Sequence, residues 1–349
     1  MRPLIILLLA SVLLHDSIAQ PAPKRLPPPG ISVPDSIRTN LQTKLQQLQD
    51  RIASAYAARS SDNVLQFFPD VQIFEKAIRY ALNHNEFYRT NEFAIAEKLI
   101  TEGLRRADNF REGKYPWRTA KGLVVRAYKS RLDDSIQPYG LVVPASFDPK
   151  SGRRHRLDIW LHGRDETLTE LKFINERSTK PGEFTPADTF VLHPYGRYCN
   201  AFKFAGEIDV LEALEAVLAE YPIDRDRIVL RGFSMGGAGV WHLATHYADR
   251  WVCAAPGAGF AETARYLRVK PETIPEFERT LWQWYDATDY ALNLFHCPTL
   301  AYSGELDKQR QAADLWKPLS ARKACLSSTS SAQKPNTNIS PKQSASSIR

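Results

Sequence analysis

The chain has 349 residues, of which 43% are hydrophobic, so it can form one large domain and an accessory segment, and nothing suggests a fibrous protein. Its formal net charge is +7, but residues 320–349 hold five basic and no acidic residues, which leaves only +2 for the remainder. No basic stripe with interleaved aromatics occurs in the body, so we expect no nucleic-acid partner.

The first residues have the pattern of a secretory signal peptide. Arg2 precedes an apolar run over residues 4–14, and a small-x-small pattern ends at Ala19. His15 follows the run, which is shorter than the roughly 18 residues needed to cross a bilayer. We expect residues 1–19 to be cleaved after Ala19, which predicts a secreted or periplasmic protein without a membrane anchor.

A proline-rich linker over residues 20–34 precedes an all-helical segment over residues 35–112. Apolar residues recur there at helical spacing: Leu41, Leu45, Leu48 and Ile52, then Ile73, Ala77, Ile78 and Ala81. Asn91 is the candidate N-cap of a third helix that frays at Asn109. The leucine face is more typical of core packing than of a partner-binding zipper.

From residue 113 short apolar runs alternate with helical patterns. Residues 121–130 and 137–148 predict an antiparallel pair, and residues 207–220 predict a helix. Further apolar runs indicate buried strands, at 157–161, 189–193, 228–233, 251–257 and 298–303. The polar residues 224–227 are expected to form a turn. The order predicts an α/β fold with a doubly wound, mostly parallel sheet over residues 113–317.

The sequence IVLRGFSMGG, residues 228–237, contains Gly232, Ser234 and Gly236 in the spacing of a GxSxG nucleophile elbow. In such an elbow a buried strand turns sharply into a helix and the serine occupies the corner, in a strained backbone conformation. The predicted strand before Ser234 and helix after it fit this context. The alternative is a glycine-rich turn that contains an incidental serine.

An acid is expected from the loop after a later strand, because the triad order in this fold is serine, acid, histidine. Asp307 follows the predicted strand at 298–303 and is the preferred acid. Glu305 is the competitor, and a helix-capping aspartate is the structural alternative.

An oxyanion hole needs preorganised N–H donors. The backbone N–H of Met235, directly after the serine, is the first candidate donor. The second is expected from LHGRD, where Gly163 or Arg164 would donate, and His162 is predicted to orient that loop rather than to act as the base.

The motifs HGRD, DRDRIVLRGFSMGG and SGELD resemble those of secreted α/β-hydrolases of the prolyl oligopeptidase (S9) type and related esterases, over residues 121–307. The resemblance implies serine-dependent acyl transfer to water, without a cofactor, from peptide, ester or acylated polysaccharide substrates. No β-propeller is present. No HExxH motif or paired His/Asp cluster indicates a metal.

The expected general base has no counterpart after Asp307, because no histidine follows it. His242 and His246 lie eight and twelve residues past Ser234, at least roughly 12 Å along the predicted helix. His193, at the carboxyl end of its predicted strand, is the one candidate for a substitute base.

Residues 318–349 are serine-rich, without aromatic residues or glycine, and are predicted to be a disordered tail. The expected last strand, histidine loop and closing helix do not appear in the sequence. We hypothesise a reading frame lost near residues 316–320, which would leave the strand at 298–303 as an exposed sheet edge.

Two functions therefore stay open at this stage, an exported serine hydrolase that lacks its base and a catalytically inactive α/β-hydrolase-like binding protein. The sequence does not indicate the substrate or the oligomeric state. The four cysteines have no CxxC spacing: Cys199, Cys253, Cys297 and Cys325. Export makes a disulfide possible, but Cys253 and Cys297 lie in apolar, strand-like runs, where a small buried residue is favoured over disulfide formation.

Overall fold

The structure is a computed structural model that describes residues 26–59, 62–304, 306, 307, 312, 314 and 327–332. The predicted signal peptide lies outside the described residues, as does most of the predicted tail. Within the described ranges, none of the helices combines the length and the apolar character that crossing a membrane requires.

The helices are distributed over the whole described chain. The α-helices are α1 (Asp35–Ala58), α2 (Asp62–Leu65), α3 (Pro69–Asn83), α4 (Glu92–Arg111), α5 (Glu170–Thr179), α6 (Ala205–Glu220), α7 (Met235–His246), α8 (Thr263–Leu267) and α9 (Glu276–Gln283). Short 3-10 helices are η1 (Pro116–Arg118), η2 (Ala248–Arg250), η3 (Pro271–Thr273) and η4 (Ala287–His296).

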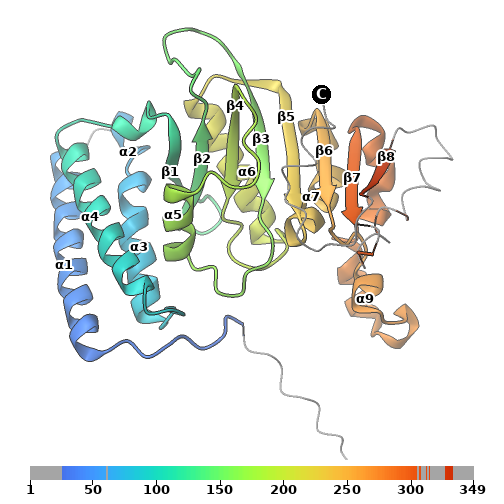
Figure 1. Cartoon of the computed structure of the whole chain (residues 1–349), viewed down its shortest axis with the longest axis horizontal. Coiled ribbons are helices and arrows are strands. Elements are labelled where there is room, and N and C mark those ends of the chain that lie inside the picture. The colour runs from blue at the N-terminus through green and yellow to red at the C-terminus, as the bar shows by residue number, and fades with distance from the viewer. Residues whose placement is uncertain are drawn as a thin grey trace, which may run out of the picture.

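The strands form one sheet in the order β1-β2-β4-β3-β5-β6-β7-β8 (Figure 1). They are β1 (Gly122–Lys129), β2 (Ile136–Val143), β3 (His155–Leu161), β4 (Thr189–Pro194), β5 (Ile223–Phe233), β6 (Cys253–Gly257), β7 (Thr299–Gly304) and β8 (Ser327–Ala332). Strand β2 is antiparallel to β1 and β4, and the other neighbouring pairs are parallel. This confirms the predicted doubly wound α/β-hydrolase fold, with the GxSxG serine between β5 and α7.

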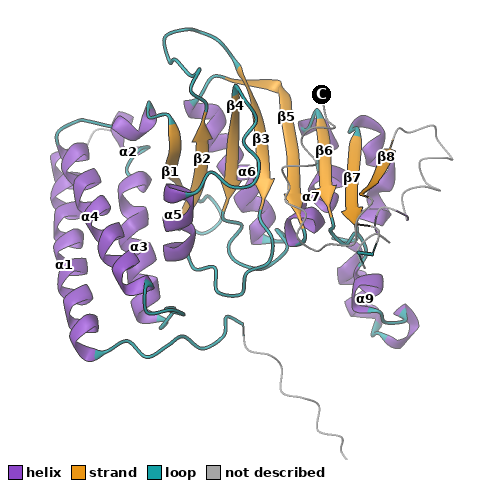
Figure 2. Ribbon diagram, in the orientation of Figure 1, coloured by secondary structure: helices purple, strands orange, loops and turns teal. Residues whose placement is uncertain are grey.

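Alternate residues of the central strands face two different layers. Phe190 and Leu192 of β4 pack in the core that α6 and α7 cover, whereas Val191 packs with Trp160 and Phe184 on the opposite face. Figure 2 shows α6 and α7 passing behind the strands, with α5 on the near side at the β1–β2 end. Both faces of the parallel strands are therefore buried there, which explains why those strands read as continuous apolar runs.

The N-terminal helices pack on this sheet as well as on one another. Helices α1, α3 and α4 are in mutual contact, and α3 also contacts β1, β2 and α5 (Figure 1). Leu41, Leu45 and Leu48 are buried in this layer, which confirms the predicted core face. The Lys76 ammonium of α3 lies 2.6 Å from Glu170 of α5, and both side chains are at most 10% exposed. The N-terminal helices are thus joined to the sheet and its helices, while the predicted domain boundaries stay predictions.

Three local expectations are wrong. Asn91 precedes α4, but its side chain makes no capping hydrogen bond because its backbone is already helical. Residues 224–227 are not a separate turn; they lie within β5 as an irregularity between two paired stretches.

The third wrong expectation concerns the sheet edge. Strand β8 pairs in parallel with β7, so a strand does occur after residue 317 and β7 is not the edge. Main-chain pairing requires no apolar alternation, and the serine-rich sequence therefore gave no signal of it. Cys253 and Cys297 are free thiols, as predicted; Cys297 is buried, whereas Cys253 is only partly buried. Cys199 is also free, and Cys325 lies outside the described residues.

Candidate active site

Ser234 stands at the corner between β5 and α7, where the sequence predicts the nucleophile. Its backbone has φ 56° and ψ −117°, a combination that non-glycine residues rarely adopt and that stores strain. The side chain is exposed, and the Ser234 N–H donates to the Gly257 carbonyl at the end of β6. The strand-to-helix elbow is therefore present, with the Ser234 hydroxyl accessible from solvent.

The flanking glycines are required by close backbone contacts. A Cβ atom on Gly236 would lie 1.9 Å from the Leu161 carbonyl oxygen, and one on Gly232 would lie 2.5 Å from the Gly236 carbonyl oxygen. These distances are far below van der Waals contact, so no side chain fits at either position. The elbow thus brings β5 and α7 directly against the end of β3.

The predicted oxyanion loop after β3 lies beside the serine. A Cβ atom on Gly163 would be 3.8 Å from the Ser234 Cβ, so the two residues are neighbours with little between them. Met235 is the first residue of α7, and its N–H has no acceptor within the helix. The positive end of the α7 dipole also lies here. This geometry can stabilise negative charge next to Ser234, while the individual donors stay predictions.

His162 bridges two loops instead of contacting the serine. Its ring nitrogens lie 2.9 Å from the carbonyl oxygens of Gly163 and Tyr195. Burial lowers the pKa of His162, while its hydrogen bonds to the two carbonyl oxygens act in the opposite direction. Arg164, the alternative backbone donor, directs its side chain to Glu166 in an exposed ion pair of 2.9 Å. The position of His162 fits its predicted loop-orienting role.

The loop after β4 donates hydrogen bonds to the predicted oxyanion loop after β3. The Tyr198 hydroxyl donates to the Glu166 carbonyl and the Cys199 thiol to the Asp165 carbonyl, at 2.5 and 2.9 Å. Several non-glycine residues of this loop have positive φ: Arg197, Tyr198, Ala201, Phe202 and Phe204. Such a conformation persists only where surrounding contacts fix it.

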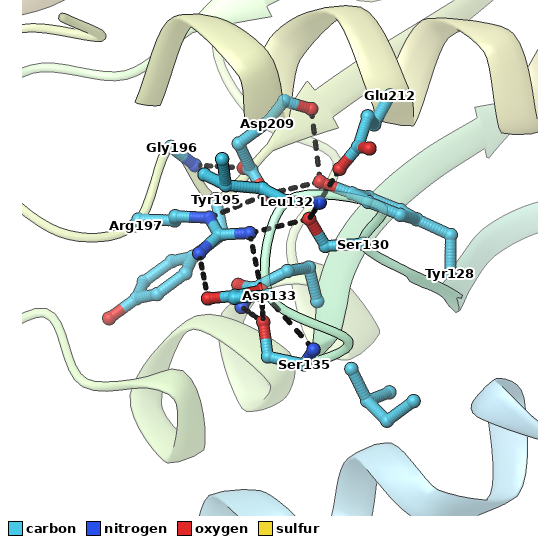
Figure 3. Close-up of polar contacts among 12 residues, drawn as sticks. Tyr128, Ser130, Leu132, Asp133, Ser135, Tyr195, Gly196, Arg197, Asp209 and Glu212 are labelled. Carbon is cyan, nitrogen blue, oxygen red and sulfur yellow. Dashed lines mark hydrogen bonds and ion pairs between the residues drawn. The ribbon is translucent and has the colours of Figure 1, made fainter. Parts of the chain in front are cut away.

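Figure 3 shows a polar network that fixes the start of this loop. Arg197 donates to Asp133 and Ser130 in the β1–β2 turn, at 2.6 and 2.7 Å. The Gly196 N–H donates to Asp209 of α6, which also accepts from the Tyr128 hydroxyl. The network joins the β1–β2 turn, the loop after β4 and α6. None of these residues was identified from the sequence, because the partners lie 13 to 81 positions apart.

Asp307 lies in the loop after β7, at the same carboxyl edge as Ser234. The carboxyl ends of β6 and β7 are joined there, because the Ala258 N–H after β6 donates to the Tyr302 carbonyl of β7 at 2.7 Å. The Asp307 N–H donates to the Gly304 carbonyl at 3.1 Å, which forms the turn directly after the strand. Its competitor Glu305 lies outside the described residues. The structure places Asp307 as predicted, and its catalytic role stays a prediction.

His193 lies at the carboxyl end of β4, but its ring is buried. Its Nδ1 is 3.1 Å from an Arg177 guanidinium nitrogen, and its Nε2 makes no hydrogen bond with the described residues. Burial, with the Arg177 charge, holds the pKa of His193 well below its usual value. Among the residues the structure describes, no histidine hydrogen-bonds to the Ser234 hydroxyl.

A second cluster was missed by sequence reasoning, which considered His242 and His246 only as bases for Ser234. Both histidines lie on one face of α7 and meet Glu207 of α6. Their spacing of four residues was a signal that the two rings share a helix face. The partner Glu207 could not be found from that spacing.

One protein-family model matches part of the chain. Residues 205–324 match the family model of the prolyl oligopeptidase family, Peptidase_S9. A search of curated proteins finds no match.

Several solved structures are similar to part of the chain. The fluorophosphonate-binding serine hydrolase FphF of Staphylococcus aureus is 18% identical with a TM-score of 0.48, over 65% of this chain and 96% of its own. The S-formylglutathione hydrolase FrmB of the same organism is 17% identical with a TM-score of 0.44, over 61% and 88%. Dipeptidyl peptidase 4 of Porphyromonas gingivalis is 17% identical with a TM-score of 0.46, over 61% of this chain but only 32% of its own.

The matched segment includes α6, the serine elbow, β6, β7 and Asp307. Both the family model and the elbow geometry indicate a serine hydrolase, peptidase or esterase. Over residues 205–324, therefore, the chain is similar to the prolyl oligopeptidase family, Peptidase_S9.

Proposed function

We propose that the chain is an exported serine hydrolase, a peptidase or an esterase, which transfers an acyl group from its substrate to Ser234 and then to water. The observation that carries the proposal is the exposed, strained Ser234 with the Gly163 backbone directly beside it. A strained serine at a helix N-terminus is costly to maintain, and its location at the carboxyl end of the central strand β5 is that of a nucleophile.

The residues at the carboxyl ends of the strands would each contribute a different step of the reaction. The Ser234 oxygen attacks the substrate carbonyl carbon, and the resulting oxyanion accepts hydrogen bonds from the N–H of Met235 and that of Gly163 or Arg164. Asp307 would orient the imidazole that takes the serine proton. As the tetrahedral intermediate collapses, the bond to the amine or alcohol leaving group breaks and that group takes the proton from the base. Water then attacks the acyl group on Ser234 and gives a proton to the base; the acid is released and the base returns this proton to the Ser234 oxygen.

The proton acceptor is the part of this mechanism that lacks an assigned residue. His193 is neutral at pH 7 because burial lowers its pKa, so it has a lone pair to offer. Its Nδ1, however, faces Arg177. The absence of a histidine bonded to Ser234 among the described residues favours a second candidate function, a catalytically inactive α/β-hydrolase-like protein that binds a ligand.

Labelling with a fluorophosphonate probe separates the two functions. Covalent labelling of the wild-type chain that disappears in Ser234→Ala requires an activated serine and would establish the hydrolase. Absence of labelling in a folded wild-type chain would establish the inactive protein. In a labelled chain, His193→Asn tests the substitute base: an unchanged rate excludes His193, and a large loss supports it.

Substrate class and export need separate measurements. Hydrolysis of p-nitrophenyl acetate but not of a prolyl p-nitroanilide peptide would indicate an esterase, and the reverse a peptidase. Export predicts that the protein recovered from the medium or periplasm begins at Gln20, which N-terminal sequencing checks. Retention of the first nineteen residues in a cytosolic protein would contradict export.

A further inference from the structure

Three potential metal ligands meet between α6 and α7, away from the Ser234 side of the elbow. Glu207 lies in the first turn of α6, and His242 and His246 lie one turn apart on α7. One nitrogen or oxygen atom from each residue falls within 4.8 Å of the other two. His242 is 1% exposed and Glu207 is 8% exposed, so the cluster is enclosed by protein.

Two of the three ligand separations in this cluster are close to those around one metal ion, and the shorter of the two is a hydrogen bond between His246 and Glu207 in this structure. Glu207 Oε2 lies 3.1 Å from His246 Nδ1 and 3.4 Å from His242 Nδ1. Ligands at about 2.1 Å from a tetrahedral Zn²⁺ lie roughly 3.4 Å from each other. The two histidines therefore already face the same carboxylate oxygen at the separation that a shared metal imposes.

The hydrogen bonds of His242 leave one of its ring nitrogens facing Glu207 without a hydrogen bond. His242 Nε2 lies 3.0 Å from the Ala201 carbonyl oxygen, to which only an N–H can donate. In a neutral imidazole the other nitrogen, Nδ1, then carries a lone pair. This Nδ1 faces the Glu207 carboxylate and makes no hydrogen bond with any described residue. Two electron pairs oppose each other unless either a second proton on His242 or a metal cation lies between them.

The neighbouring groups hold the ligands in place. The Tyr247 hydroxyl donates to Glu207 Oε1 at 2.6 Å, which fixes the carboxylate and leaves Oε2 directed at the histidines. The Tyr285 ring packs against both imidazoles, and the Tyr290 ring packs against His246. An imidazole bonded to a carbonyl and a carboxylate bonded to a hydroxyl are the usual outer partners of metal ligands.

We propose that Glu207, His242 and His246 bind a divalent transition metal, with Zn²⁺ the best match to two imidazoles and one carboxylate. The metal would join α6 to α7, the helix that begins at the serine elbow. His242 lies eight residues past Ser234, about 12 Å along the helix, so the metal does not contact the reacting atoms. Its effect is on stability, and the proposal is independent of hydrolysis by Ser234.

The test uses the full chain without a histidine tag, since a tag binds Zn²⁺ itself. After treatment with a chelator, the protein is titrated with Zn²⁺ and its melting temperature is measured. We expect one Zn²⁺ per chain by elemental analysis and a melting temperature that rises by about 5 °C or more at saturating metal. Replacement by Co²⁺ should give the visible absorption of a low-symmetry, four-coordinate site.

Matched variants make the result specific. Glu207→Gln keeps the size of the side chain and an acceptor for Tyr247, and His246→Ala removes one ligand; each should abolish the Zn²⁺-dependent rise. His296→Gln changes an exposed histidine outside the cluster and should retain it. Ser234→Ala should bind Zn²⁺ like the wild type, which separates this proposal from the proposed hydrolysis.

Three outcomes would overturn the proposal. The first is the absence of any Zn²⁺-dependent rise in the wild type, which would indicate that a proton on His242 satisfies Glu207. The second is a rise that persists in Glu207→Gln and His246→Ala, which would indicate binding elsewhere on the chain. The third is a rise that is lost equally in His296→Gln.

Discussion

Asp70 on α3 accepts hydrogen bonds from Arg126 on β1 at 3.0 Å, with both side chains almost fully buried, at 1% and 3% exposure. Asp70 also accepts from the Trp117 indole at 2.9 Å and from the Ala127 N–H at 2.8 Å. One carboxylate thus satisfies an arginine, an indole and a main-chain group. The N-terminal helices are thereby bonded to the first strand of the sheet, not merely packed on it.

Asp70→Asn should destabilise the whole described fold, because it leaves the Arg126 charge buried without its main partner. Breaking one side of a buried ion pair costs about 3–5 kcal/mol. Urea unfolding followed by circular dichroism measures the loss. Arg105→Ala is the control, since Arg105 and Glu102 form an exposed pair whose side chains are 54% and 30% exposed, and its removal should cost less than about 1 kcal/mol. Equal effects of the two variants would show that Asp70 does not anchor the helices.

Local pattern predicted much of the fold but not these polar connections. The spacing of Leu41, Leu45 and Leu48 located a buried helix face, and the apolar runs located the strands, because both patterns repeat within one element. Asp70 and Arg126 lie 56 positions apart, and neither residue type indicates burial. Their pairing depends on how α3 packs on β1, which sequence periodicity does not specify.

The candidate site was likewise only partly predictable from the sequence. Ser234 and the glycines beside it could be identified because the elbow requires particular residue types within five consecutive positions. The loop after β4, which supports the oxyanion loop, had no such signature. Its positive-φ residues include Phe202 and Phe204, which do not favour that conformation, so tertiary contacts determine it.

Alanine substitutions at two glycines near Ser234 should have different consequences. Gly236→Ala places its Cβ 1.9 Å from the Leu161 carbonyl oxygen, so backbone must move, and we expect a destabilisation of about 3 kcal/mol. Gly163→Ala places its Cβ at 3.7 Å from the Phe233 carbonyl oxygen and 3.8 Å from the Ser234 Cβ, which are ordinary contacts. This variant should fold normally, with a stability change below about 1 kcal/mol.

The Gly163→Ala and Gly236→Ala variants also test whether the substrate oxyanion lies beside Gly163. In Gly163→Ala the added methyl group occupies the space beside Ser234, so fluorophosphonate labelling should slow by about tenfold or more although the protein is folded. Thermal unfolding and labelling rates, measured on the same preparations, check both parts. A Gly163→Ala chain that labels at the wild-type rate would place the oxyanion away from Gly163.

The pair formed by Asp133 and Arg197 should make part of the stability depend on pH. Hydrogen bonds from Arg197 and Ser135 hold the pKa of Asp133 well below its ordinary value, so the folded state stabilises the charged form. A carboxyl group of this kind contributes fully above its unfolded pKa of about 4, and the contribution is lost as the pH falls through the folded pKa. Because the Asp133 side chain is 45% exposed, the contribution is at most about 1 kcal/mol.

Asp133→Asn should therefore be less stable than the wild type at pH 6 by up to about 1 kcal/mol, and the difference should shrink as the pH falls below 4. Urea unfolding at pH 6, 4 and 3 measures it. Asp134→Asn is the control, since Asp134 pairs with Lys129 at the surface and asparagine tolerates its φ of 59°. A wild-type advantage over Asp133→Asn that increases on acidification would contradict the sign of the Asp133 pKa shift, and the loop after β4 would then not depend on this charge.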